Sequence, residues 1–223
     1  MTEKDSPAAA MTEQADMTDI AVGFLAGGLA RRMGGCKKAL LEIGGQTVLE
    51  RQLAATAHHR IRLINANGDN RPFQAFGLPI VADNIADYPG PMAGILACLD
   101  YLAHYHPKIS ILLSCATDAP FIPNDLAARL SAARQAEEAD LAQASSNGRR
   151  HPVFGLWPVS LRDELRFALL QMGLRKIDHF TARYRIAVAD FSGKPDPFLN
   201  MNQPEDITRV ETALGDLIKA EDR

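Results

Sequence analysis

Residues 20–38 read IAVGFLAGGLARRMGGCKK, an apolar run followed at once by a loop rich in glycine and in cations. The apolar run, residues 20–24, predicts a buried β-strand. Four glycines and four cationic side chains follow it. Glycine lets a ligand approach the backbone closely, successive N–H groups bind anions, and arginine and lysine add positive charge. The stretch therefore predicts a triphosphate site after the first strand, the alternative being a glycine–arginine turn without a ligand.

The spacing of the glycines excludes two common phosphate-binding motifs. A P-loop needs Gly-Lys followed by Ser or Thr, whereas Gly35 is followed by Cys36. The loop also lacks the G-x-G-x-x-G spacing of dinucleotide-binding folds. What remains, L-A-G-G-x-x-x-R-M-G with a lysine after it, resembles the signature of nucleotidyltransferases, which move a nucleoside monophosphate onto a phosphate acceptor.

Composition narrows the class of protein further. The chain has 223 residues, 47% apolar, and a net charge of −3, which argues against non-specific nucleic-acid binding. No window reaches the roughly 18 apolar residues of a membrane span. Three scattered cysteines fit a reducing compartment, and we expect a cytoplasmic protein. Residues 1–18 are expected to be a disordered tail without signal-peptide features, followed by a single domain at 19–223.

Strand-like and helix-like segments alternate along the chain, which predicts a three-layer α/β fold around a mostly parallel, Rossmann-like sheet. The expected strands are residues 20–24, 62–65, 78–82, 109–115 and 186–191, with 141–144 and 153–157 pairing as antiparallel strands around a loop at 145–152. The expected helices are residues 48–57, which a capping box at Thr47–Glu50 opens, 92–102, 161–171, and two that begin near Pro123 and Pro204.

Polar residues follow several predicted strands, and in parallel sheets ligands bind at the carboxyl ends of the strands. Asp118 is placed to bind Mg²⁺, or else forms an Asx-turn or a helix cap. Asp83 accepts hydrogen bonds from a base or ribose, or else caps the turn it begins. Asn65 and Asn67 could contact a base or sugar edge, although asparagine is also a common loop residue.

Three further sets of residues are candidates for phosphate or acceptor binding. Of the two lysines that end the glycine loop, Lys38 is expected to reach the phosphates and Lys37 to be solvated. His151 could contact an anionic acceptor, or lie at a solvated hairpin tip. Asn200 and Asn202, two residues apart, would face the same side of an extended segment, where they could bind metal or acceptor or simply precede a helix.

With these residues assembled, the chain resembles the bacterial molybdenum cofactor guanylyltransferases from residue 20 to the last helix. Beyond the glycine loop, the segments that carry the resemblance are 65–67 (NAN), 83–94 (DNIADYPGPMAG), 118–123 (DAPFIP), 151–152 (HP) and 198–206 (FLNMNQPED). The glycine signature alone is shared with many nucleotidyltransferases, and the NAN and NMNQPED segments make the resemblance specific.

The resemblance implies a single α/β nucleotidyltransferase domain of the GT-A-like type. It implies that GMP passes from GTP to the phosphate of molybdenum-molybdopterin, giving the guanine dinucleotide cofactor and pyrophosphate, with Mg²⁺ on Asp118. It also implies partners among molybdenum-insertion proteins and molybdoenzyme apoproteins or their chaperones, and a monomer is expected. The residues that the resemblance assigns to GTP are Leu25, Ala26, Gly27, Lys38, Asn65, Asp83 and Asp118.

A phosphate monoester acceptor is already anionic near pH 7, because its second pKa is about 6, so no general base is needed. The expected catalytic residues are Arg31 or Arg32 with Lys38 on the β- and γ-phosphates, and Asp118, through Mg²⁺, on the α-phosphate. The family usually has an aspartate where this chain has Lys37. The alternatives are a cytidylyltransferase acting on molybdopterin or on a sugar or polyol phosphate, and a non-catalytic nucleotide-binding adaptor for molybdoenzymes.

Overall fold

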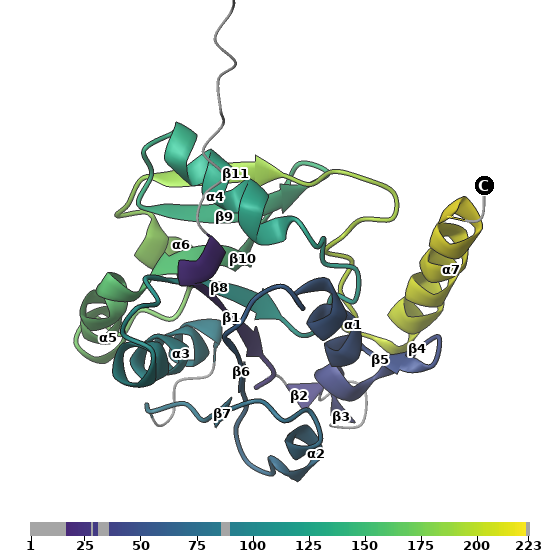
Figure 1. The fold of residues 1–223 in the computed structure, drawn as a ribbon, viewed down its shortest axis with the longest axis horizontal. Helices are drawn as coiled ribbons and strands as arrows, with labels where there is room; N and C mark the ends of the chain where they lie inside the picture. Colours follow the sequence, from purple (N-terminus) through teal and green to yellow (C-terminus); the bar gives the residue numbers. More distant parts are fainter. Residues whose placement is uncertain (1–16, 28, 31–35, 86–89, 222–223) are drawn as a thin grey trace, which may run out of the picture.

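A seven-stranded sheet forms the centre of the molecule, in a computed structural model that describes residues 17–27, 29–30, 36–85 and 90–221. The strand order is β11-β9-β10-β8-β1-β6-β7 (Figure 1). Every neighbouring pair is parallel except those that include β10. The predicted α/β class is therefore confirmed. The strands are β1 (Ile20–Leu25), β6 (Arg62–Asn65), β7 (Ile80–Val81), β8 (Ile111–Ala116), β9 (Leu141–Ser146), β10 (Arg149–Pro158) and β11 (Ile186–Asp190).

Helices cover both faces of this sheet, because alternate strand residues point to opposite faces. Phe24 of β1 belongs to the core with α1, α2 and α4, while Ala21 belongs to the core with α3, α5 and α6. Figure 1 shows α1 and α4 away from α3 and α5. The helices are α1 (Val48–Ala55), α2 (Arg71–Gln74), α3 (Pro91–Tyr105), α4 (Leu126–Ala136), α5 (Arg162–Leu170), α6 (Ile177–Thr181) and α7 (Pro204–Glu221).

Smaller elements flank the sheet on the side of the glycine loop. Two short hairpins pair β2 (Leu29–Ala30) with β3 (Cys36–Lys37), and β4 (Glu42–Ile43) with β5 (Gln46–Thr47). Helix α7 lies against the second hairpin (Figure 1), with a small apolar cluster between them. Short 3₁₀ turns span Met17–Asp19, Lys38–Leu40 and Val159–Leu161. No helix in the described ranges is both long and apolar enough to cross a membrane.

Three predicted boundaries are wrong. The strand expected at 78–82 contains only β7, and the helix expected at Pro123 begins at Leu126. The loop expected at 145–152 is a turn at Asn147 and Gly148, both with positive φ, between strands that extend to Ser146 and from Arg149. Asn-Gly favours this tight hairpin turn, and the charged residues and proline after it lie in the partly exposed part of β10, where polar side chains cost little.

The predicted capping box of α1 is confirmed. The Thr47 hydroxyl accepts a hydrogen bond from the Glu50 N–H at 3.1 Å, and the Glu50 carboxylate accepts one from the Thr47 N–H at 2.6 Å. We expect Thr47→Ala to lower the free energy of unfolding by about 1 kcal/mol, since one N–H at the start of the helix then loses its partner. Urea unfolding of Thr47→Ala beside Thr47→Ser, which keeps the hydroxyl, measures this; equal stability of the two variants would contradict it.

Candidate nucleotide-binding site

The carboxyl ends of four parallel strands, β7, β6, β1 and β8, meet at one edge of the sheet. Asp83 follows β7, Asn65 ends β6, Ala26 and Gly27 follow β1, and Asp118 follows β8. The Ala26 N–H donates to the Asn65 carbonyl at 2.8 Å, which joins the ends of β1 and β6. The predicted residues therefore share one edge, as expected for a ligand site in a parallel sheet.

Asp118 lies in a turn whose backbone is attached to neighbouring segments. The Met201 N–H donates to the Asp118 carbonyl at 2.9 Å, which brings the segment before α7 to the end of β8. The Thr117 hydroxyl donates to the Leu25 carbonyl at 3.1 Å. Asp118 is thus placed next to the end of β1, where the glycine loop begins.

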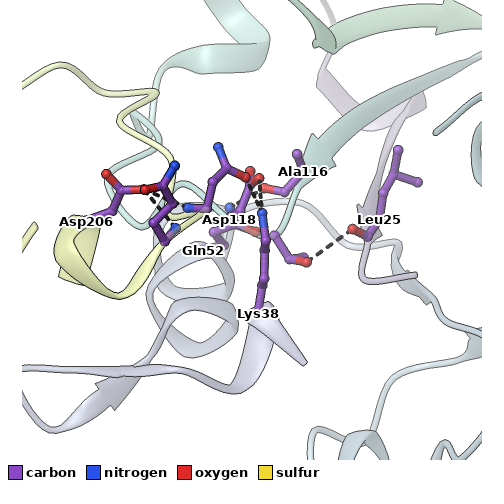
Figure 2. A network of polar contacts seen from close by, with 9 residues as sticks. Leu25, Lys38, Gln52, Ala116, Asp118 and Asp206 are labelled. Atoms are coloured by element: carbon purple, nitrogen blue, oxygen red, sulfur yellow. Dashed lines mark hydrogen bonds and ion pairs between the residues drawn. The ribbon is translucent and has the colours of Figure 1, made fainter. Parts of the chain in front are cut away.

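Lys38 connects the glycine loop to this acid. Its ammonium group donates to Asp118 Oδ2 at 3.2 Å and to the side-chain oxygen of Asn202 (Figure 2). The side chains of Lys38 and Asp118 are 16% and 22% exposed, so the pair is open to a ligand but partly shielded from water. Two of the predicted phosphate and metal residues and one predicted acceptor residue therefore meet here.

Asp206, in the first turn of α7, fixes the backbone around Asn202. Its Oδ2 accepts hydrogen bonds from the N–H groups of Asn202 at 2.8 Å and Gln203 at 3.0 Å (Figure 2). The Asn202 N–H is the main cause of the lowered pKa of the Asp206 carboxyl. This role of Asp206 is not among those predicted from the sequence, although an acid three residues after the residue that precedes the helix has the capping-box spacing.

A second polar cluster lies at the ends of β6 and β7. Asp83 Oδ1 accepts from the Asn65 amide at 2.7 Å, and its Oδ2 accepts from the Asn67 amide at 2.8 Å. The Asn67 side-chain oxygen accepts from the Asp83 N–H at 2.8 Å. A β-carbon built on Gly27 would lie 3.5 Å from the Asn67 amide nitrogen and 3.7 Å from Asn65 Oδ1. The lysine–aspartate pair therefore lies on the β8 side of β1, and this amide cluster lies on the β6 side.

Gly94 of α3 is required by the position of Asn65. A β-carbon at Gly94 would lie 2.3 Å from Asn65 Oδ1, well inside contact distance. Asn65 cannot easily move, since it is 3% exposed and its amide also donates to the Val81 carbonyl at 3.1 Å. Gly94 is thus another residue of the site, which in the sequence was visible only within the segment 83–94.

We expect Gly94→Ala to weaken GTP binding about tenfold, because the new methyl group displaces Asn65 from Asp83. A tenfold change corresponds to about 1.4 kcal/mol of binding free energy, the scale of one lost hydrogen bond. Gly215→Ala in α7 is the matched control, since a β-carbon there meets nothing within 4 Å. Calorimetric titration of both variants with GTP measures the effect. Unchanged affinity in Gly94→Ala would show that Asn65 does not contribute to binding.

The side chain of Lys37, where the family usually has an acid, lies at a different place from that of Lys38. Its ammonium group donates to the Asp69 carbonyl and lies 4.6 Å from the centre of the Phe73 ring. Lys37 ends β3 and Lys38 begins the 3₁₀ turn that follows, and their ammonium groups contact different segments of the chain. The charge of Lys37 is therefore directed toward α2 and its preceding loop and not toward Asp118.

His151 contacts residues at the end of β9 and the segment before α7. Its Nε2 lies 2.8 Å from the Ser146 hydroxyl, which donates to Asp196 at 2.8 Å, and its ring lies 4.7 Å from that of Phe198. Burial lowers the pKa of the His151 ring, and the charge of Asp196 opposes that shift only in part. His151 lies within β10 and not at a hairpin tip, so the interpretation as a solvated tip is wrong.

Three other predicted residues are not seen in contact with Lys38 or Asp118. Asn200 is partly buried, and its side chain is not part of the Lys38 contacts. Arg31 and Arg32 lie outside the described residues. Four further residues contact the segments of the site and are not among those predicted from the sequence: Gln52, Thr117, Ser146 and Asp196.

The oxygen donors at the end of β8 fit a hard divalent cation. Mg²⁺ is usually bound by one or two carboxylates with waters and substrate phosphates, and the side-chain oxygens of Asp118 and Asn202 both lie against Lys38. Among the described residues no group of three His, Cys, Asp or Glu side chains is placed to form a metal site. Any cation here therefore needs ligand oxygens from the nucleotide or water.

Three features meet at one edge of this α/β sheet: a glycine loop after β1, an acid after β8 and a lysine between them. Together they define the class of nucleotidyltransferases. A family model described as the MobA-like NTP transferase domain matches residues 22–187. The chain therefore belongs to the MobA-like NTP transferase family.

Two relatives are similar over nearly their whole length. The chain is 52% identical to the molybdenum cofactor guanylyltransferase of Nitrobacter hamburgensis, covering 84% of this chain and 91% of that one. It is 49% identical to that of Rhodopseudomonas palustris, covering 84% and 90%. A crystal structure of molybdopterin-guanine dinucleotide biosynthesis protein A from Archaeoglobus fulgidus has a similar fold, with a TM-score of 0.70 at 22% identity over 88% of this chain and 99% of that one.

Proposed function

We propose that this site transfers GMP from GTP to the terminal phosphate of molybdenum-molybdopterin, forming the guanine dinucleotide cofactor and releasing pyrophosphate. The observation that carries the proposal is the meeting of Lys38, Asp118 and Asn202 beside the end of β1. The names of the relatives supply the identity of the base and of the acceptor.

The phosphate side of the site neutralises charge. Lys38, with Arg31 or Arg32 and the loop N–H groups, binds the β- and γ-phosphates of GTP, and Leu25, Ala26 and Gly27 contribute backbone at the end of β1. The ammonium group of Lys38 contacts a carboxylate oxygen of Asp118 and an amide oxygen of Asn202, which supports its assignment to phosphate oxygens. A cation at that position stabilises the negative charge that develops on the departing pyrophosphate.

The cluster at the ends of β6 and β7 binds the guanosine part. The Asp83 carboxylate and the amides of Asn65 and Asn67 form one hydrogen-bonded group, and such groups are pre-oriented acceptors and donors for a base edge or a ribose. Guanine presents two adjacent N–H groups from which a carboxylate can accept hydrogen bonds. Cytosine has a ring-nitrogen acceptor beside its amino group and cannot make both of these bonds. Asp83 is the residue we assign to that contact.

Asp118, with the oxygen of Asn202 nearby, would bind Mg²⁺, which supplies charge neutralisation to the triphosphate when bound. An oxygen of the acceptor phosphate forms a bond to the α-phosphorus of GTP, and the bond from that phosphorus to the oxygen bridging to the β-phosphate breaks. The protein provides positioning and electrostatic stabilisation, which supply most of the catalysis in phosphoryl-type transfer. No general base is needed, since the acceptor is already ionised.

The segment from Asp196 to Asn202 is the proposed boundary of the acceptor side. It contacts His151 through Phe198 and reaches Lys38 through Asn202, so it connects the end of β9 to the phosphate side. His151, Asn200 and Asn202 are the candidate acceptor-binding residues. We propose that the chain acts in the cytoplasm as a monomer and delivers its product to molybdenum-insertion proteins and to molybdoenzyme apoproteins or their chaperones.

Nucleotide preference tests the proposed function. We expect GTP, with Mg²⁺, to bind at least tenfold more tightly than CTP or ATP, because a hydrogen-bonding site rejects a base that leaves its buried polar groups unpaired. Titration calorimetry with the three nucleotides gives the comparison directly. A preference for CTP would instead identify a cytidylyltransferase, and a preference for ATP would contradict the assignment of Asp83 to guanine.

A further inference from the structure

The side chain of Gln52 reaches the Asp118 turn from helix α1. It is completely buried, and its amide nitrogen donates hydrogen bonds to the carbonyls of Ala116 and Ala119, each at 2.8 Å (Figure 2). These two carbonyls lie on either side of Asp118 in the chain. A single side chain from another element thus fixes both ends of the turn that presents the acid.

The opposite end of the same amide has no partner. Gln52 Oε1 is buried and lies without a hydrogen-bond partner among the described residues. An unpaired buried acceptor is unfavourable, and an apolar side chain of the same length would avoid it but would leave the carbonyls of Ala116 and Ala119 without this donor. The reverse orientation of the amide would place its oxygen against two carbonyl oxygens, so the two donated bonds decide how the group sits. Glutamine therefore holds the two carbonyls of the turn although its own oxygen stays unpaired.

We propose that Gln52 is a positioning residue for catalysis, which fixes the Asp118 carboxylate against Lys38 and the triphosphate. The proposal rests on the proposed function of Asp118. Gln52 reaches the turn through its two donated hydrogen bonds, and its contacts are to backbone and not to a ligand. Groups that orient a metal- or phosphate-binding carboxylate from behind typically change affinity or activity by about 10- to 100-fold when they are removed.

The variant Gln52→Met tests this role, because methionine has the same length and lacks both the donors and the unpaired oxygen. We expect the dissociation constant for GTP with Mg²⁺, measured by calorimetry without acceptor, to rise about tenfold and kcat to fall. The melting temperature should fall as well, because the carbonyls of Ala116 and Ala119 lose their donor. Gln143→Met is the matched control. Gln143 is also buried, but its amide contacts Thr181 at 3.5 Å, so that variant should bind GTP normally.

A double-mutant cycle separates positioning from a general effect on folding. If Gln52 acts through Asp118, the loss of affinity from Gln52→Met should largely disappear when Asp118→Asn is already present. Normal GTP affinity in Gln52→Met, or an undiminished loss in the Asp118→Asn background, overturns the proposal. Should the methionine variant not fold, Gln52→Asn, which keeps the amide but is one methylene shorter and so cannot reach both carbonyls in the same way, gives the same comparison. If the unaltered chain bound no GTP, the proposed function itself would fail, which is a distinct result.

Discussion

Asp118→Asn is expected to lower the rate of GMP transfer roughly 100- to 1,000-fold, the scale on which removal of one charge-stabilising group acts. Asparagine keeps the shape of the side chain and removes only the negative charge. That charge is the one the proposal places against Mg²⁺, and its oxygen already accepts from Lys38 at 3.2 Å. The steady-state rate of pyrophosphate release at saturating GTP and Mg²⁺ measures the effect.

The same change should leave the fold intact. Lys38 keeps its contact with the Asn202 oxygen in this variant, so loss of the pair with Asp118 should lower the melting temperature only modestly. Asp125→Asn is the matched control, because that aspartate lies seven residues further along and forms only an exposed pair with Arg129 at 3.8 Å. Near-normal turnover in Asp118→Asn would exclude a role for this carboxylate in metal binding.

Lys38→Met is expected to reduce kcat by about 100-fold and to raise the KM for GTP, since methionine keeps the apolar length and removes the cation that neutralises the phosphates. Two anionic substrates meet at this point, and removal of positive charge weakens both their binding and the stabilisation of the leaving pyrophosphate. Initial rates over a range of GTP concentrations separate the two parameters.

The neighbouring lysine offers a control one residue away. Lys37 contacts the Asp69 carbonyl and the Phe73 ring, so Lys37→Met should change kcat/KM by no more than about threefold, the scale of an exposed contact. The two variants remove the same charge at two positions, so comparing them tests whether the position of the charge matters and not only its sign. Equal losses in Lys37→Met and Lys38→Met would show that the loop acts through its net charge, contrary to the geometry.

The part of the site that the sequence predicted is the part made of short, local patterns. The apolar run of β1 and the polar residue after each parallel strand place Asn65, Asp83 and Asp118 at one edge, because chain direction fixes where strand ends meet. The cap of α1 was predicted for the same reason, since its bonds join residues three apart. Local chemistry was sufficient in these cases.

The rest depends on contacts between distant segments. Lys38 and Asn202 are 164 positions apart, and no spacing rule brings them together. In the sequence, Gln52 is indistinguishable from any other polar residue of a helix. Only the path of the connection between β8 and α4 brings the carbonyls of Ala116 and Ala119 to its amide. His151 was assigned to a loop because two arginines and a proline surround it, whereas pairing with β9 decides its conformation.

Transfer of the α-phosphate tests the central claim most directly. The purified chain is incubated with Mg²⁺, molybdenum-molybdopterin and GTP labelled at the α-phosphate, and the label is followed. We predict that it appears in a dinucleotide in one-to-one proportion with released pyrophosphate, and that CTP labelled in the same way transfers at least tenfold more slowly. Tight GTP binding without transfer of the label, or faster transfer from CTP, would contradict the account.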